Sequence, residues 1–150
     1  MAVRVQREEF DVGTELKALT KGNPQIGGLC AFTGLVRDVN DGKSVSTLTL
    51  EHYPGMTEKM LERIEAEANA RWNLEATLII HRFGAMEPEE VIVLTAAASS
   101  HRGDAFAACQ FMMDYLKTEA PFWKVEDTGE GTRWVDSRDS DRDARERWKG

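Results

Sequence analysis

"GDAFAACQFMMDYLKTEAPFWKVE" (residues 103–126) predicts a long helix that is followed at once by a strand. Pro121 ends the helix, because proline lacks a backbone N–H and its ring clashes with the preceding turn. The residues after that point, "PFWKVE", favour a short final strand because aromatic and β-branched side chains are frequent in strands. This boundary places Lys117 in the last helical turn and Lys124 inside the strand.

A second clear helix covers residues 56–72. Met60, Ile64 and Ala68 recur at intervals of four residues, as in an amphipathic surface helix. The charged residues, Glu65 among them, fall between these apolar positions, so we expect them to face solvent.

The remaining elements predict an α+β fold. Strands are expected over 27–37, 45–53, 76–84 and 90–100, and a short helix over 14–22 with Thr14 as its cap and Gly22 at its end. The dipeptide Asp41-Gly42 predicts a hairpin between the first two strands. Hairpin-connected strands favour a mainly antiparallel sheet with helices on one side.

Composition excludes several classes of protein. A chain of 150 residues suits one domain with a core, and a net charge of -7 argues against non-specific nucleic-acid binding. No apolar run is long enough to span a bilayer, and the first ten residues lack the apolar core of a signal peptide. Cys30 and Cys109 form no C-x-x-C motif and lie among apolar residues, so we expect reduced thiols in a cytoplasmic protein.

The end of the chain differs in composition from the rest. We expect a single domain over residues 1–135 and a charged tail over 136–150, "DSRDSDRDARERWKG". Because charges of both signs are dense there, we interpret the tail as a solvated helix or a frayed end.

The position of Lys117 leaves two interpretations open. On a helical wheel it lies within about 20° of Phe106 and about 40° of Met113, so it shares a face with large apolar residues. A buried lysine favours its neutral form and can act as acid, base or nucleophile. Alternatively, its stem crosses apolar surface and its ammonium lies in water, near the negative end of the helix dipole.

Further cations lie at the ends of predicted elements. Lys124 is either a functional cation or a strand residue that faces solvent opposite a buried tryptophan. His101 and Arg102 join a strand to a helix, where free backbone N–H groups favour an anion. Arg37 ends a strand shortly after Gly34, a residue that allows close approach to the backbone.

Known catalytic and metal motifs are missing. His52, His81 and His101 are too scattered to predict a metal site, and His81 is interpreted as a core histidine. The chain has no nucleotide-binding glycine loop, no G-x-S-x-G and no H-E-x-x-H. These patterns predict an acidic α+β domain with cationic sites for an anionic small molecule, and no metal or bound cofactor.

Five segments in order resemble one family, the large, catalytic subunit of molybdopterin synthase. They are "FTGLVRD" (32–38), "LEHYPGMTEKML" (50–61), "IIHRFG" (79–84), "SSHRGDAF" (99–106) and "MDYLKTEAPFWKVE" (113–126). The resemblance extends from about the first strand to Trp134.

That resemblance implies a fold, a reaction and partners. The fold would be an α/β hammerhead with an additional antiparallel β subdomain. The reaction would transfer two sulfurs to cyclic pyranopterin monophosphate and form the dithiolene of molybdopterin. The sulfur donor would be a small ubiquitin-like subunit with a C-terminal Gly-Gly thiocarboxylate. Two large and two small chains would form a heterotetramer around a homodimer of large subunits.

The resemblance also implies roles for individual residues. Lys117 matches the lysine where the small-subunit tail ends, and Lys124 matches a second essential lysine. The residues matching the phosphate pocket are Arg37, His101 and Arg102, and those flanking the site through their backbone are Leu35, Val36, Val125 and Glu126.

Some positions depart from the common pattern of the family. Val125 stands where a basic residue is frequent, and Phe122 stands where isoleucine is frequent. The loop Pro88-Glu89-Glu90 stands where many members have a glycine. A role for the Val125 side chain is therefore not expected.

Two other functions are compatible with these residues. A chain of this fold could dock a ubiquitin-like tail without chemistry, as a binding module. Alternatively, Lys117 could form a Schiff base in a lyase that acts on a phosphorylated carbonyl compound.

Overall fold

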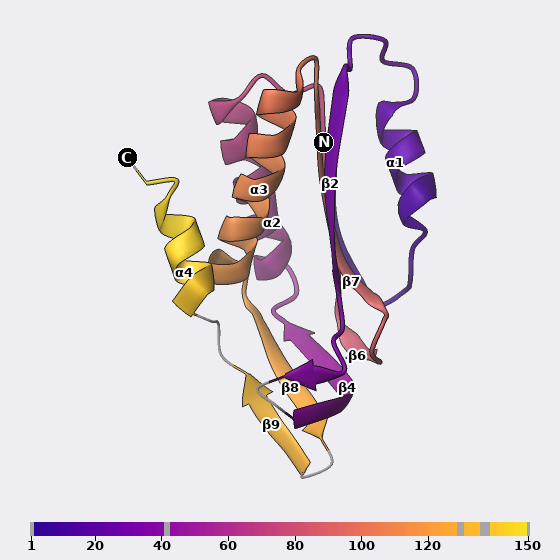
Figure 1. Cartoon of the computed structure of the whole chain (residues 1–150), viewed down its shortest axis with the longest axis vertical. Coiled ribbons are helices and arrows are strands. Elements are labelled where there is room, and N and C mark those ends of the chain that lie inside the picture. The colour runs from indigo at the N-terminus through magenta and orange to yellow at the C-terminus, as the bar shows by residue number, and fades with distance from the viewer. Residues whose placement is uncertain (1, 41–42, 129–130, 136–138, 150) are drawn as a thin grey trace.

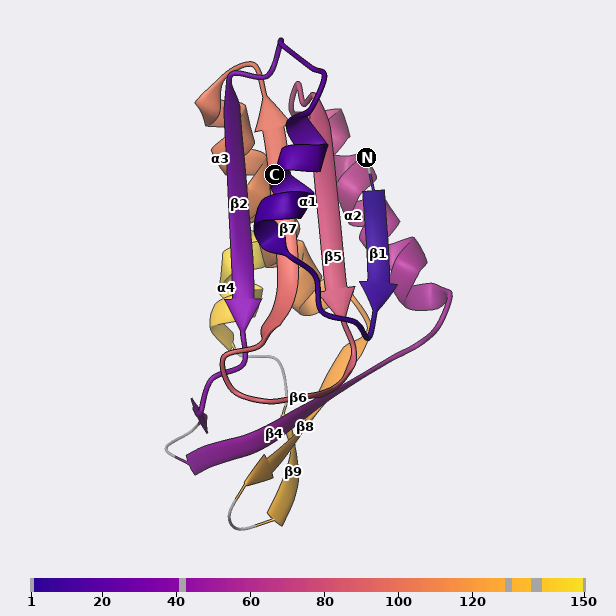
Figure 2. The ribbon, with the colours of Figure 1, turned by 90° about the vertical axis from the view of Figure 1, so that its right-hand side faces the viewer.

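The computed structural model describes residues 2–40, 43–128, 131–135 and 139–149, with side chains described over 2–38, 47–122 and 143–149. Its main sheet is seen edge-on in Figure 1 and face-on in Figure 2, and its strand order is β1-β5-β7-β2. The strands are β1 (Ala2–Gln6), β5 (Ala76–Arg82), β7 (Val91–Ser99) and β2 (Gly28–Leu35). β1 runs parallel to β5, and the other pairs are antiparallel, so the sheet is mixed.

Helices cover both faces of this sheet, so the prediction of helices on one side is wrong. α2 (Met56–Arg71) and α3 (Arg102–Glu119) pack on one face, and α1 (Val12–Thr20) packs on the other. Figure 2 shows α1 lying across β7 and β5. The cause is that these strands have apolar residues on both faces: Ile79 belongs to the core under α2 and α3, whereas Ile80 faces α1.

A second sheet lies at one end of the first (Figure 1). Its long strand, β4 (Lys43–His52), pairs with β8 (Phe122–Thr128), which in turn pairs with β9 (Gly131–Val135). Two short strands, β3 (Val39–Asn40) and β6 (Gly84–Met86), also pair with β4. The whole is a mixed α+β fold.

The predicted hairpin pairing of the strand at 27–37 with the strand at 45–53 is wrong. β2 pairs with β7, and only β3 pairs with β4 across residues 41–42, which lie outside the described part of the chain. The physical reason is a bulge between Gly34 and Leu35, where β2 leaves the ladder of the main sheet.

The predicted helices are confirmed with small changes at their ends, but two details differ. α1 begins after Asp11, and Thr14 donates its hydroxyl hydrogen to Asp11 Oδ2 at 2.5 Å instead of capping the helix. Glu65 of α2 was expected to face solvent, yet it is buried against the sheet. There it accepts a hydrogen bond from Thr77 Oγ1 at 2.7 Å and one from the Ala2 backbone N–H at 3.0 Å.

The end of the chain forms α4 (Asp139–Glu146), which packs on α3 (Figure 1). Trp148 follows it and meets Trp72 and Phe111 edge to face, with ring centroids 5.5 and 5.7 Å away. Its indole N–H donates to Asp114 Oδ2 at 2.6 Å. This anchoring was not expected from a tail of dense charge. No helix over the described residues is long and apolar enough to cross a membrane.

Candidate functional site

The end of β2 is shaped by a β-bulge. Gly34 pairs with Val93 and Leu35 with Val91, so the register shifts between them. A Cβ atom on Gly34 would lie 2.8 Å from Val93 Cγ1, which explains the glycine. Beyond this shift Val36 is buried, whereas Leu35 and Arg37 on either side of it are exposed, as in an extended chain.

Val36 connects this strand end to the second sheet. Its side chain packs with Leu48, Leu50 and Met86. In the register of β4 and β8, Leu50 is paired with Lys124. The backbones of Val125 and Glu126 continue that ladder opposite Thr49 and Leu48, but the side chains of all three β8 residues lie outside the described ones. The backbone of Lys124 therefore lies near the strand end that carries Arg37.

Lys117 lies in the last turn of α3, as predicted, but its side chain is exposed. Of the two interpretations, burial of the amine is not observed; of the apolar residues on its side of the helix, Met113 is buried, but Phe106 is 60% exposed. Its surroundings correspond to the second interpretation, with the ammonium at the helix surface near the C-terminal dipole.

The junction after α3 is held by packing and hydrogen bonding. Ala120 ends the helix, and Thr57 Oγ1 donates to the carbonyl oxygen of Pro121 at 3.3 Å. Phe122 then stacks on His81, with 3.7 Å between ring centroids. His81 is buried and its Nδ1 lies 2.8 Å from the Arg82 carbonyl oxygen, which confirms it as a core histidine.

His101 and Arg102 lie at the opposite end of α3, at its N-terminus, and both are exposed. The start of β2 is adjacent, because a Cβ atom on Gly28 would lie 3.3 Å from the Arg102 Cα. The helix N-terminus supplies backbone N–H groups, so this end matches the predicted anion site in position and charge.

The predicted site residues fall into two separate groups. Arg102 and Lys117 are fifteen residues apart on one helix, which corresponds to about 22 Å. β2 gives a similar separation, because the seven steps from Gly28 to Leu35 cover about 23 Å. The last residues of β2 and α3 lie toward the second sheet, and the first residues of both elements lie at the far end (Figure 1). By their positions in the chain, Arg37, Lys117 and the backbone of Lys124 therefore belong to the end near the second sheet, and His101 and Arg102 to the far end. One chain does not bring them into a single pocket.

A pocket of about 350 Å³ elsewhere on the surface is unsuited to an anion. It is lined by Glu9, Phe10, Pro88, Glu89, Glu90 and Val91, so its charged side chains are all acidic. Within the described ranges no group of three or more histidine, cysteine or acidic residues could hold a metal ion. The pocket is therefore not a candidate for the substrate.

Cys109 is unsuited to nucleophilic chemistry. Cys109 is buried, and burial raises the pKa of its thiol to about 12, so little thiolate exists near neutral pH. Cys30 is half-buried against the same core. Both are free, as the sequence predicted for core thiols.

Sequence reasoning missed the residues that hold the end of β2. In the sequence, the segment "IIHRFG" at 79–84 contributed only to the resemblance to a known family. Nothing in the spacing of its residues indicated that its arginine is buried. In the structure Arg82 is buried and bonded to Glu90, in the loop that contacts Val36.

Fold and charge together define a class: a two-sheet α+β protein with exposed cationic side chains at its strand and helix ends. A family model described as MoaE protein matches residues 5–119, more than half of the chain. The chain belongs to the MoaE protein family.

Relatives and solved structures agree with this assignment. A molybdopterin synthase catalytic subunit from Ralstonia nicotianae is 58% identical over 146 residues, which are 97% of this chain and 83% of that protein. The molybdopterin biosynthesis MoaE protein from Burkholderia ambifaria has a TM-score of 0.84 at 54% identity, over 99% of this chain and 98% of its own. A chain in the complex of subunits 1 and 2 of molybdopterin-converting factor from Helicobacter pylori has a TM-score of 0.75 over 91% of each chain. At 19% identity, that likeness shows the fold alone.

Proposed function

We propose that this chain is the catalytic subunit of a molybdopterin synthase. It transfers two sulfurs from the thiocarboxylated C-terminus of a small ubiquitin-like subunit to cyclic pyranopterin monophosphate, and so forms the molybdopterin dithiolene. The observation that carries the proposal is the similarity to molybdopterin synthase catalytic subunits over nearly the whole chain. The exposed cations Arg37 and Lys117, toward the same end of the main sheet, support it.

The charges of the reactants explain the proposed roles of the cations. The thiocarboxylate is an anion, and Lys117 would meet it where the small-subunit tail ends. Its sulfur bonds to a carbon of the substrate, and water then attacks the resulting thioester, so that the acyl C–S bond breaks and the small subunit leaves as a carboxylate. This hydrolysis passes through a tetrahedral species with developing negative charge, which a lysine ammonium stabilises. Lys117, Lys124 or His101 would transfer the protons needed to open the cyclic phosphate and to lose the ring oxygen. No cofactor takes part in this scheme.

The phosphate of the substrate requires donors that fit its geometry. Arginine offers parallel N–H groups to a phosphate, so Arg37 and Arg102 suit that role, with His101 beside them. The remaining proposed contacts are made by the backbone, at Leu35, Val36, Val125 and Glu126. Residues 1–135 would form this cytoplasmic domain, an α/β hammerhead with an additional antiparallel β subdomain, and 136–150 its charged tail.

The separation of the two cation groups is resolved by a second copy of the chain. β2 is the last strand in the order of the main sheet. Exposed apolar side chains lie on it and on α3, namely Leu29, Phe32, Leu35 and Phe106. A two-fold axis that aligned two β2 edges antiparallel would place the Gly28 end of one copy beside the Leu35 end of the other. His101 and Arg102 of one copy would then complete the site around Arg37 and Lys117 of its partner. This is the homodimer of the proposed heterotetramer.

Reconstitution tests this function. The protein would be mixed with a thiocarboxylated small subunit and cyclic pyranopterin monophosphate, and the dithiolene product assayed after oxidation to a fluorescent pterin. Wild type should form product, and Lys117→Ala should not. Lys17→Ala is the matched control, because Lys17 is also an exposed lysine in the last turn of a helix, on the other face of the sheet.

Each other outcome favours a different function. Complex formation without product from wild type would favour the binding module. Borohydride trapping of a substrate adduct on Lys117 would favour the Schiff-base lyase. Full turnover by Lys117→Ala would contradict the role given to that lysine.

A further inference from the structure

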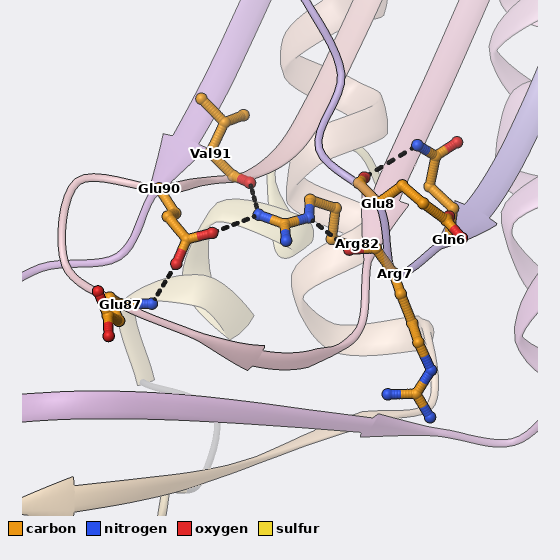
Figure 3. Close-up of polar contacts among 7 residues, drawn as sticks. All are labelled: Gln6, Arg7, Glu8, Arg82, Glu87, Glu90 and Val91. Carbon is orange, nitrogen blue, oxygen red and sulfur yellow. Dashed lines mark hydrogen bonds and ion pairs between the residues drawn. The ribbon is translucent and has the colours of Figure 1, made fainter.

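Arg82 is a buried cation at the end of β5, with its side chain 7% exposed. Its Nε donates to the Arg7 carbonyl oxygen at 3.0 Å, and its Nη1 donates to Glu90 Oε1 and to the Val91 carbonyl oxygen, each at 3.2 Å (Figure 3). A guanidinium is rarely buried unless it is paired and hydrogen-bonded. These bonds tie two segments of the chain, the one after β1 and the one at 90–91, to one side chain of β5.

Glu90 connects Arg82 to the loop 87–90. Its Oε2 accepts the backbone N–H of Glu87 at 2.5 Å, so the carboxylate lies between Arg82 and the start of the loop (Figure 3). The N–H of Glu87 and the charge of Arg82 lower the pKa of Glu90, so the carboxylate is charged at neutral pH. A backbone bond from Glu90 N to the Glu87 carbonyl oxygen, at 3.2 Å, closes the turn.

The same loop holds the end of β2 beyond the bulge. The Val36 N–H donates to the Glu90 carbonyl oxygen at 3.0 Å, and the Glu89 N–H donates to the Val36 carbonyl oxygen at 2.9 Å. Val36 has by then left the register that β2 shares with β7, which ends at Leu35 and Val91. The loop therefore supplies the backbone partners for the residue directly before Arg37.

We propose that Arg82 and Glu90 are positioning residues, which fix the loop 87–90 and thereby the backbone from which Arg37 reaches the substrate phosphate. The inference rests on the proposed function, because it assigns Arg37 to phosphate binding. A bidentate arginine contact depends on placement to within about 0.5 Å, which an unsupported strand end does not provide. Neither Arg82 nor Glu90 touches the substrate in this scheme.

The test compares Glu90→Gln with a matched control. Glu90→Gln keeps the shape of the side chain and removes the charge that pairs with Arg82. Glu15→Gln removes the same charge from another arginine–glutamate pair, which joins Arg4 of β1 to Glu15 of α1. We expect Glu90→Gln to raise KM for cyclic pyranopterin monophosphate about tenfold, with kcat changed less than about twofold, because binding and not chemistry is lost. Glu15→Gln should behave as wild type.

A double-mutant cycle separates positioning from general damage. If Glu90 acts through Arg37, Glu90→Gln should have no further effect on KM in an Arg37→Ala background. Effects that multiply in the double variant would overturn the proposal and leave Glu90 with a purely structural role. If wild type and Arg37→Ala behave as the proposed function requires while Glu90→Gln is normal, this inference fails and the function stands.

Amide hydrogen exchange gives a readout that needs no turnover. Loosening of the loop should speed exchange at the Val36 N–H in Glu90→Gln and leave it unchanged in Glu15→Gln. Unchanged exchange at Val36 would overturn the proposal even if wild type formed no product. If Glu90→Gln did not fold, Glu90→Asp would take its place, since it keeps the charge and shortens the reach toward Arg82.

Discussion

His81 stacks on Phe122, with 3.7 Å between the ring centroids and 17° between the ring planes. His81 is buried in β5 of the main sheet, whereas Phe122 is the first residue of β8 in the second sheet. His52 of β4 lies in the same group, 4.1 Å from the Phe83 ring and 6.4 Å from Phe122. The stack therefore joins the two sheets two residues before Lys124.

We expect Phe122→Ala to lower the free energy of unfolding by about 2 kcal/mol, because it removes the stack and leaves a cavity at a half-buried position. Phe122→Ile should cost less than half as much, since isoleucine restores most of the apolar volume. Urea denaturation of both variants gives the two values. Equal losses would contradict the expected role of apolar volume and would mean that the aromatic stack alone stabilises this junction.

Gly34→Ala should destabilise the protein by about 2 kcal/mol through overpacking, because the new methyl group would meet Val93 Cγ1. Val93 is β-branched and buried, so it has little freedom to turn away. The companion variant Val93→Ala should make the additional cost of Gly34→Ala close to zero. A cost that persisted in the Val93→Ala background would locate the strain in the backbone and not in this contact.

The sequence predicted local elements well wherever a single pattern dominated. Residues 56–72 were expected to be helical and form α2, because Ile64 and Ala68 repeat at helical spacing and reach the core. The helix at 103–120 ends where Pro121 requires it. The sequence did not predict β1, because "AVRVQ" is short. It forms a strand by pairing with β5, whose residues lie more than seventy positions away in the sequence.

The site was predicted residue by residue but not as an arrangement. Glu65 was wrongly predicted to face solvent. The periodicity of the helix does not show that Thr77 and the Ala2 N–H, on the strands that face it, donate hydrogen bonds to its carboxylate. The burial of Arg82 likewise depends on the carbonyl oxygens of Arg7, directly after β1, and of Val91 in β7. One feature was available from the sequence alone: a helix that begins at Arg102 and ends beyond Lys117 must hold these cations about 22 Å apart.

Glu89 has a φ of 79°, in the left-handed region that favours glycine. It lies in the loop 88–90, where many members of the family have a glycine. We expect Glu89→Gly to stabilise the protein by about 1 kcal/mol, because it relieves this conformation. Glu87→Gly in the same loop is the control and should destabilise, since glycine there adds only chain entropy to the unfolded state. Thermal or urea unfolding measures both, and a destabilised Glu89→Gly would show that its side chain contributes more than its backbone costs.

Glu65 should make stability depend on pH in an unusual direction for a carboxylate. Burial is the largest influence on it and raises its pKa above the ordinary 4.5, against the lowering effect of the hydrogen bond from Thr77. The folded state therefore holds a proton more tightly than the unfolded chain does. By linkage, the contribution of Glu65 is complete below the unfolded pKa and is lost as the pH rises through the raised folded pKa.

Glu65→Gln should remove this loss, because the amide oxygen still accepts the bonds from Thr77 and Ala2 and carries no charge. We expect the variant to gain stability relative to wild type as the pH rises above 4.5. Urea denaturation from about pH 4 to about pH 8 measures the difference. Glu67→Gln, on an exposed position of the same helix, should follow the wild-type curve. A Glu65→Gln curve parallel to wild type would mean that the carboxylate titrates alike in the folded and unfolded chains, and that its hydrogen bonds offset its burial.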